Sequence, residues 1–336
     1  MRYVGLDVHK NNIAACIIGD NGKPVKMIEM PDRSGLPDII DTMKGTKYCV
    51  MMESSTYIYD VYRFFSDLGV EAHVAHARGL KMITSSDRKT DRRDAETIGR
   101  YLRLWKRGEL DLSLAYMPTK EEVALKDLCR LKEETSKKIG DEARRIKSHM
   151  ARNMEIFPNG NSDLSVKKVR KALRENYPQD TVLMLRLGVL EDFRGLNEQL
   201  TANIKSMLPE SEDVELLCSI PGIARQSAVQ IMSMIVDVHR FEDPEKLCSY
   251  FGLVPRVRDS GGKMKHGHMT KNGDRMMRSI MERVTLSHIL HCDSSITKYH
   301  RRKLQEMGQK KALISASRKM LVVIYSVLIR KQPFRM

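Results

Sequence analysis

The periodicity of apolar and polar positions changes near residue 118. The two patterns predict two kinds of structure. In the first part, short apolar runs alternate with turn residues. Five of these runs predict strands, at 2–8, 13–18, 25–30, 48–52 and 70–75. Three segments have the periodicity of amphipathic helices, at 35–44, 57–68 and 91–106. Three antiparallel strands followed by alternating helices and strands predict an α/β domain with a ribonuclease-H-like layout.

From Thr119, apolar residues recur at spacings of three and four through a highly charged stretch, which predicts a long amphipathic helix to about Met150. A second long stripe runs from Val189 to Met207. The connection, 157–180, is predicted to contain one short basic helix. Two long stripes around a linker favour an antiparallel helical hairpin or an intermolecular coiled coil, which we interpret as a scaffold and an oligomer contact. Packing without an oligomer is the simpler alternative.

The remaining third predicts a mainly helical domain. Residues 216–236 have the pattern of a helix-hairpin-helix, with the tight turn at 220–223. Such a turn exposes backbone N–H groups at the start of the next helix, which suits a phosphate, and a helical turn without DNA fits the same pattern. Further helices are predicted at 274–291 and 312–328. We therefore expect three domains, at 1–112, 113–210 and 211–336.

Charge narrows the choice of partner. The 336 residues contain 58 Lys and Arg against 43 Asp and Glu, a net charge of +15. Such an excess favours a polyanionic partner, nucleic acid before a membrane surface. The six cysteines are scattered without zinc-type spacing and predict reduced core residues. No apolar run approaches a membrane span and the chain starts with a predicted strand, so we expect a cytoplasmic, nucleoid-associated prokaryotic protein.

Two carboxylates open the predicted helix at 91–106. Asp91 and Asp94 are three residues apart and share a helical face, with Arg92 and Arg93 between them. A metal-dependent nucleic-acid site needs this combination, because cations hold the phosphates and carboxylates hold the divalent ion. The alternative is an ordinary helix start, with Asp91 as the N-cap and Asp94 facing the positive end of the helix dipole.

Two further acids interrupt or end predicted strands. Asp7 lies inside the apolar run at 2–8, and Glu53 follows the run at 48–52. An acid in a buried strand is unfavourable unless it is paired, hydrogen-bonded or coordinated. In the predicted layout Asp7 lies on the central strand and Glu53 at the end of its neighbour, so the two can share a metal. Singly, each acid also fits a turn or an edge.

The densest polar segment is 256–278, with seven Lys and Arg against two Asp. Ser260 precedes Gly261 and Gly262, where the backbone can approach a ligand closely. The surrounding cations favour a phosphate-sized site, namely Arg256, Arg258, Lys263, Lys265, Lys271 and Arg275. A flexible basic loop that contains a turn serine is the alternative.

Short motifs occur in a fixed order along nearly the whole chain. They are Gly5-Leu6-Asp7-Val8-His9-Lys10, Met52-Glu53-Ser54-Ser55, Lys89-Thr90-Asp91-Arg92-Arg93-Asp94-Ala95, Ile220-Pro221-Gly222-Ile223, Phe251-Gly252-Leu253-Val254-Pro255 with Asp259-Ser260-Gly261, Thr270-Lys271-Asn272-Gly273-Asp274-Arg275 and Ser317-Arg318-Lys319-Met320-Leu321. This ordered set closely resembles the DEDD insertion-sequence transposases of the IS one-ten group.

The resemblance implies a RuvC-like N-terminal domain, a coiled-coil linker and a C-terminal transposase domain. It implies that Asp7, Glu53, Asp91 and Asp94 are ligands of Mg²⁺ or Mn²⁺ and that Ser260 is the nucleophile. It also implies a structured non-coding RNA, encoded by the element, that pairs with donor and target DNA. The segment after Ser260 departs from the expected pattern because it is richer in Met and His.

We therefore expect a DNA transposase that excises and inserts a mobile element through a phosphoserine link at Ser260. Its expected partners are double-stranded DNA, a guide RNA and further copies of the chain, as a dimer to tetramer. Phosphate contacts are expected from Arg92, Arg93 and the cations around Ser260. The first alternative is a Holliday-junction or structure-specific nuclease that uses the acidic site alone. The second is a nucleic-acid scaffold without chemistry.

Overall fold

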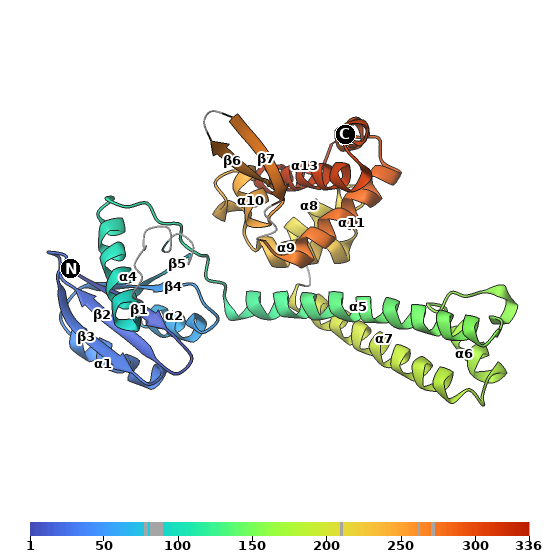
Figure 1. Ribbon diagram of the computed structural model, residues 1–336, viewed down its shortest axis with the longest axis horizontal. Helices are drawn as coiled ribbons and strands as arrows, with labels where there is room; N and C mark the ends of the chain where they lie inside the picture. Colours follow the sequence, from blue (N-terminus) through green and yellow to red (C-terminus); the bar gives the residue numbers. More distant parts are fainter. Residues whose placement is uncertain (77–79, 81–89, 209–210, 261–262, 270–272, 336) are drawn as a thin grey trace. The chain divides into compact units, whose positions relative to one another are not determined.

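The chain folds into two compact units, Met1–Pro118 and Thr119–Met336. The structure is a computed structural model that describes residues 1–76, 80, 90–208, 211–260, 263–269 and 273–335, with the main chain alone at 159, 255–260 and 263–269 (Figure 1). Within these residues, the first unit is built on a five-stranded sheet, and the second is helical apart from one two-stranded hairpin.

The sheet of the first unit has the strand order β3-β2-β1-β4-β5. Its strands are β1 (Arg2–Val8), β2 (Ile13–Ile18), β3 (Pro24–Met30), β4 (Tyr48–Glu53) and β5 (Glu71–Ala75). Strand β2 runs antiparallel to β1 and β3, whereas β4 and β5 run parallel to β1. The five strands lie where the apolar runs predict them, and the expectation of a mixed α/β N-terminal unit is confirmed.

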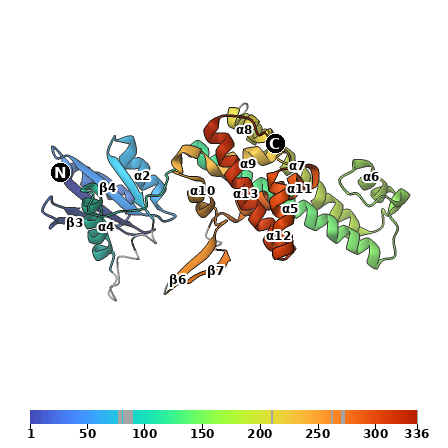
Figure 2. The same cartoon turned by 90° about the horizontal axis from the view of Figure 1, so that it is seen from above.

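Helices cover both faces of this sheet (Figure 1, Figure 2). They are η1 (Arg33–Gly35), α1 (Leu36–Met43), α2 (Ile58–Asp67) and α4 (Asp91–Lys106). Because side chains alternate along a strand, Val4 and Leu6 of β1 face α1 and α2, while Tyr3 packs in the core that contains α4. A central strand covered on both faces needs apolar residues at nearly every position, which explains why β1 is an almost continuous apolar run.

Two glycines let α4 approach the sheet closely. A Cβ added to Gly5 would lie 2.2 Å from the carbonyl oxygen of Ala95 and 2.2 Å from the backbone nitrogen of Gly99. A Cβ on Gly99 would meet the Ile18 side chain at 2.9 Å. Only a hydrogen at these positions lets the backbones of β1 and α4 come into contact. This contact sets the height of α4 above β1, and with it the position of the first turn of the helix.

The second unit begins with a helical hairpin. Its long helices are α5 (Lys120–Arg152) and α7 (Thr181–Met207), and the connection contains η2 (Pro158–Gly160) and the basic helix α6 (Lys167–Asn176). Hydrogen bonds join Ser136 to Asn197 and His149 to Asp180, so the two helices run antiparallel. Thr119 starts α5 with a reciprocal capping box to Glu122. Of the two arrangements that the stripes favour, the structure has the intramolecular hairpin.

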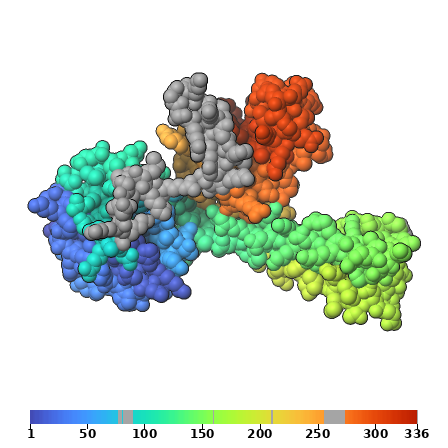
Figure 3. Space-filling view, in the orientation of Figure 1, coloured from blue at the N-terminus to red at the C-terminus, as the bar shows by residue number. Residues whose placement is uncertain are grey.

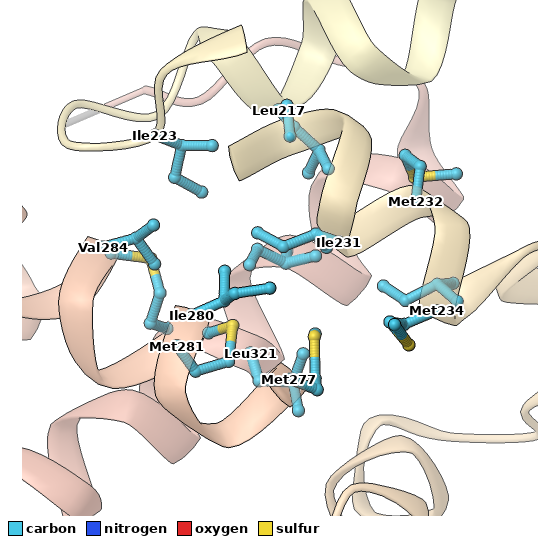
Figure 4. Packing of buried hydrophobic residues seen from close by; sticks show 14 of the residues in the cluster. Leu217, Ile223, Ile231, Met232, Met234, Met277, Ile280, Met281, Val284 and Leu321 are labelled. Carbon is cyan, nitrogen blue, oxygen red and sulfur yellow. The ribbon is translucent and has the colours of Figure 1, made fainter. Parts of the chain in front are cut away.

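The rest of the second unit packs around one apolar core. Its elements are α8 (Glu212–Cys218), α9 (Arg225–Ile235), η3 (Val238–Arg240), α10 (Pro244–Tyr250), β6 (Pro255–Ser260), β7 (Lys263–Met269), α11 (Arg275–His291), α12 (Ser295–Glu306) and α13 (Gln309–Arg330). Leu217, Ile231, Ile280 and Leu321 meet in this core from α8, α9, α11 and α13 (Figure 4). The mainly helical prediction is confirmed for the described residues.

Two helices and one strand pair of this region were not predicted from the sequence. The helices are α10 and α12, and the strand pair is the antiparallel β6 and β7. These strands lie in the densest polar segment, for which a flexible loop was the alternative to a phosphate-sized site. Within the described part of the chain these strands pair only with each other, and their sequences lack the apolar alternation that marks a strand. The pairing of Ser260 with Lys263 leaves two glycines between the strands, a combination that is itself a hairpin signal.

The turn between α8 and α9 packs on α11. Gly222 has a φ of +94°, and a Cβ there would lie 2.6 Å from the backbone nitrogen of His288. The ring Nδ1 of His288 is 2.6 Å from the carbonyl oxygen of Pro221. The glycine is therefore required for packing within the protein, which favours the structural interpretation of this turn over a phosphate site.

Among the described residues, one helix, α13, is long and apolar enough to cross a membrane, contrary to our expectation that no apolar run approaches a span. Eight of its residues are buried inside the second unit, among them Ala316, Met320 and Ile324. Helix α13 therefore has the burial of a core helix, which passes the same test of length and composition.

We expect Gly5→Ala to destabilise the first unit by about 3 kcal/mol or more, because the added methyl group would overlap the α4 backbone. Guanidinium unfolding followed by the fluorescence of Trp105, the sole tryptophan, measures this change. Gly188→Ala on α7 is the control, since its Cβ meets nothing within 4 Å. Equal stability of the Gly5→Ala variant and the wild type would contradict the close contact.

Candidate acidic site and nucleic-acid interface

The candidate site lies at the end of β1, on the sheet face that α4 covers. Asp7 is only 7% exposed. Strand β1 pairs with β4 up to Leu6 opposite Met52, so Asp7 and Glu53 are the next residues of two neighbouring parallel strands. Met51 packs in the core under α4, and the alternation of side chains therefore directs Glu53 toward the same face. The sheet thus brings the two strand acids to one edge of one face.

Helix α4 supplies the other two acids from its first turn. Its N-cap is Thr90, whose hydroxyl oxygen accepts from the backbone N–H of Arg93 at 3.4 Å. The alternative in which Asp91 is the N-cap is therefore wrong, and Asp91 is the first residue of the helix. Asp91 and Asp94 lie in the first turn of α4, which continues into the buried Ala95 and Ile98. The Asp91 side chain is 46% exposed, so its carboxylate lies at the border between the sheet and solvent.

Three side chains of this region meet directly. The Nε2 atom of His9 lies 3.2 Å from Asp7 Oδ2 and 3.9 Å from Asp91 Oδ1. Asn12 Nδ2 donates to Asp91 Oδ2 at 2.7 Å. One ligand atom from each of Asp7, His9 and Asp91 lies within 4.8 Å of the other two. Strand β1, the turn after it and α4 therefore form a group that can hold a divalent ion.

Electrostatics at Asp7 show an excess of negative charge. Burial raises the pKa of Asp7 above its usual range, and the neighbouring carboxylates of Asp94 and Asp91 raise it further, while His9 opposes both effects. Asp94 acts on this pKa through its charge, whereas the ligand atoms that lie within 4.8 Å of one another come from Asp7, His9 and Asp91. A cation at this position would relieve the burial penalty and the repulsion together. The residues therefore fit a divalent metal, since carboxylates are its preferred ligands.

His9 and Asn12 are site residues that sequence reasoning did not single out. His9 is two residues beyond Asp7, and Asn12 begins the return toward β2. His9 lies 82 residues and Asn12 79 residues before Asp91 in the sequence. A local sequence pattern therefore cannot predict these contacts. The only signal was a polar residue shortly after an acid in a buried strand.

The cations that we expect to contact phosphate have different neighbours in the structure. Arg92 forms a two-pronged ion pair with Glu29, with its Nη2 donating to Glu29 Oε2 at 2.9 Å. Arg92 lowers the pKa of Glu29, and Glu29 would have to be displaced before Arg92 could bind a phosphate. Arg93 and Arg275 are exposed.

The basic hairpin is described through its main chain. Strand pairing sets Arg258 opposite Lys265 and Ser260 opposite Lys263. Arg256 lies on the same strand as Ser260, near its start. Lys271 lies outside the described residues. The hairpin therefore carries the serine at the end of a strand, next to the turn.

Comparison with known proteins identifies the class of enzyme. Residues 4–155 match a DEDD transposase model of the IS110 type, and residues 214–301 match the model described as "Transposase IS116/IS110/IS902 family". The two ranges include the acidic site and the basic hairpin. They define a transposase, a class of enzyme that cleaves and recombines DNA. The chain belongs to the IS110 family of these enzymes.

Individual relatives agree with this assignment. The transposase for insertion sequence element IS1111A of Coxiella burnetii is 22% identical over 100% of this chain and 92% of its own length. A putative transposase of Sinorhizobium fredii is 26% identical over 83% of this chain and 70% of its own length. The pilin gene-inverting protein of Moraxella lacunata is 30% identical over 35% of this chain and 38% of its own length.

Asp7→Asn should stabilise the metal-free protein and remove its response to Mg²⁺. Because the folded-state pKa of Asp7 is raised, its ionised form destabilises the fold at neutral pH, and this penalty disappears as the pH falls through the raised pKa. Unfolding in chelator should therefore need more guanidinium for Asp7→Asn than for wild type at pH 7. With Mg²⁺ at a hundred times its dissociation constant, wild type should gain about 2.7 kcal/mol and the variant nothing.

The control for this experiment is Asp111→Asn, which removes an exposed carboxylate from the same unit and should change neither quantity. A lower stability of Asp7→Asn in chelator would show that Asp7 has a structural role that outweighs its burial penalty. An undiminished Mg²⁺ response would remove Asp7 from the metal site.

Proposed function

We propose that this transposase excises and inserts a mobile DNA element with one metal-binding acidic site and one serine nucleophile. The observation that carries the proposal is the meeting of Asp7, His9 and Asp91 under the first turn of α4, within a region that matches the DEDD transposase model. The sheet order, with three antiparallel strands followed by two parallel ones, supports a ribonuclease-H-like, RuvC-like domain. We further propose the division into 1–112, 113–210 and 211–336.

In the proposed site, Mg²⁺ or Mn²⁺ is held by Asp7, Glu53, Asp91 and Asp94. The bound ion supplies positive charge that neutralises a scissile phosphate and eases loss of the serine proton. Helix α4 contributes the positive end of its dipole at the same place. His9 orients the carboxylate of Asp7 through their 3.2 Å contact.

In the proposed reaction, Ser260 Oγ attacks the phosphorus of a DNA phosphodiester. The Oγ–P bond forms, the bond from phosphorus to the departing strand's oxygen breaks, and that oxygen takes up a proton. The phosphoserine link keeps the bond energy for rejoining. Arg256, Arg258, Lys263 and Lys265 stabilise the charge that builds up on phosphorus, while Lys271, Arg275, Arg92 and Arg93 hold neighbouring phosphates. Because the acids and Ser260 belong to different units, both units take part.

The alternative is a nuclease in which the acidic site activates water and Ser260 is incidental. The basic hairpin separates the two hypotheses, since only the serine mechanism leaves protein covalently joined to DNA. The match of 214–301 to the second transposase model, immediately around this hairpin, favours the serine mechanism.

Ser260→Ala should abolish the covalent intermediate and slow strand cleavage by at least about three orders of magnitude. The measurement is a denaturing gel of a suicide DNA substrate, in which wild type should show a protein-linked strand and Ser260→Ala none. Ser249→Ala, an exposed serine on α10, is the matched control and should behave as wild type. Asp94→Asn should lose cleavage but keep DNA binding, because the cations remain. Cleavage by Ser260→Ala at the wild-type rate would favour the nuclease.

We also propose a homo-oligomer, because joining two DNA ends requires at least two active sites. Helix α7 supports this, since it leaves a row of apolar side chains in solvent, namely Val182 at 49%, Leu185 at 67%, Val189 at 42% and Leu196 at 38% exposure. A dimer to tetramer would cover such a row. We place this assembly in the cytoplasm, on nucleoid DNA.

Target choice is proposed to come from a guide RNA encoded beside the gene. The basic charge of the chain is spread over several regions, which favours backbone contacts that do not read sequence. Base pairing by an RNA can then supply the choice of donor and target.

Rewriting the pairing segments of the guide RNA should redirect recombination to the matching new sites. The measurement is recombination of purified protein with plasmid donors and targets, with the natural flanking RNA, the rewritten RNA or none. The expected result is product only where the RNA pairs with both DNAs. Efficient site-specific recombination without RNA would show that the side chains read the DNA.

A further inference from the structure

The tip of the helical hairpin lies where α5 ends and α7 begins (Figure 1, Figure 3). A second group of metal-type side chains lies there. His149, Glu155 and Asp180 each offer one ligand atom, and the three atoms lie within 4.8 Å of one another. Imidazole and carboxylate at such distances are the side chains that hold zinc in proteins. The transposase chemistry proposed above makes no use of this group.

Local structure holds each of the three residues in place. His149 lies in the last turn of α5, and its side chain is 9% exposed. Asp180 is the N-cap of α7, where its Oδ1 accepts from the backbone N–H of Leu183 at 2.9 Å. Glu155 follows the end of α5, with its N–H donating to the carbonyl oxygen of Met150 at 3.0 Å. Met154, with a φ of +55°, makes the left-handed turn that aims Glu155 back toward the helix.

The hydrogen bonds of this group are incomplete. His149 Nε2 lies 2.5 Å from Asp180 Oδ2 and 3.1 Å from Asn153 Nδ2. One ring nitrogen cannot donate to the carboxylate and accept from the amide at the same time. In addition, the Oε2 atom of Glu155 is buried without a hydrogen-bond partner. A buried, unpartnered carboxylate oxygen is unfavourable by itself, and here it belongs to a residue whose carboxylate is directed at two other ligands.

We propose that the hairpin tip binds one divalent transition-metal ion of the zinc type. His149 Nε2 and one carboxylate oxygen each from Glu155 and Asp180 are its protein ligands, with water at the remaining position. Two carboxylates and a neutral imidazole carry two negative charges, which the ion cancels. Zinc–nitrogen and zinc–oxygen distances of about 2.0–2.1 Å require ligand atoms about 3.3 Å apart. On binding the ion, His149 Nε2 and Asp180 Oδ2, now 2.5 Å apart, would move slightly apart; all three ligand atoms already lie within 4.8 Å of one another.

The expected effect of this ion is structural. It would join the end of α5 to the start of α7 across the connection at 153–180, and so clamp the tip of the hairpin. Imidazole favours zinc over magnesium, so a large excess of Mg²⁺ should leave this site to Zn²⁺. The acidic site of the first unit can compete for the same ion, and this possibility determines the design of the test.

The experiment uses the full-length Asp7→Asn protein, in which the acidic site is weakened, in buffer with excess Mg²⁺. Zn²⁺ is titrated against a chromogenic chelator, and Co²⁺ is titrated in parallel to record visible absorption. We compare Asp7→Asn alone with double variants that add Glu155→Gln or the matched control Glu198→Gln, an exposed acid on α7. Asp180 is left unchanged because it also caps α7.

The proposal expects one Zn²⁺ per chain for Asp7→Asn and for the Glu198→Gln control, with affinity at least about tenfold weaker for Glu155→Gln. It also expects the intense visible bands of four-coordinate Co²⁺, lost in Glu155→Gln. Circular dichroism checks that each variant is folded. If Glu155→Gln does not fold, the Co²⁺ spectrum and the zinc count of Asp7→Asn decide alone. Absence of bound Zn²⁺ in Asp7→Asn, or equal affinity of the two double variants, would overturn the proposal.

Discussion

The contact between the backbones of β1 and α4 determines the geometry of the acidic site. Gly5 and Gly99 leave no room for side chains between strand and helix, so α4 lies closer to the sheet than side-chain packing would normally allow. Asp7 is two residues after Gly5, and Asp94 is next to Ala95, the helix residue that Gly5 touches. Acids from both elements therefore share one small space. A looser contact would separate them by the width of a side chain and disperse the site.

The same closeness makes the site unfavourable without a cation. Burial and the carboxylates of α4 both raise the pKa of Asp7, and His9 compensates only in part. The N-terminus of α4 adds partial positive charge, and Asn12 satisfies one oxygen of Asp91. These compensations fall short of neutralising the acids. A fold that keeps such a group of charges in place gives up stability at this position.

In the second unit, polar side-chain pairs between α5 and α7 set the register of the helical hairpin. Glu142 is 3% exposed and is paired with Arg145 on its own helix and with Arg186 on α7, the latter at 2.7 Å. Removing one partner of a buried ion pair leaves an uncompensated charge, so sliding α5 along α7 is strongly disfavoured. Apolar residues such as Ile146 and Leu187 fill the seam between these pairs. The hairpin can therefore be long and highly charged and still have one register.

Local sequence determined most of the elements, and it determined which residues to inspect. Strand β4 ends at Glu53 and α4 begins at Asp91, as predicted, because apolar periodicity and helix caps act over a few residues. The charge excess and the ordered motifs indicated an enzyme that acts on DNA. Tertiary structure alone decided which side chains meet. The contacts of His9 and Asn12 with Asp91, of Arg92 with Glu29 and of His149 with Asp180 join residues 31 to 82 positions apart. Such pairs arise from the packing of whole elements, whereas a periodic pattern reports only which face of an element is buried. The hairpin of β6 and β7 was missed for a related reason. Its strands are held by backbone pairing, and their sequences have no apolar alternation from which strands could be predicted.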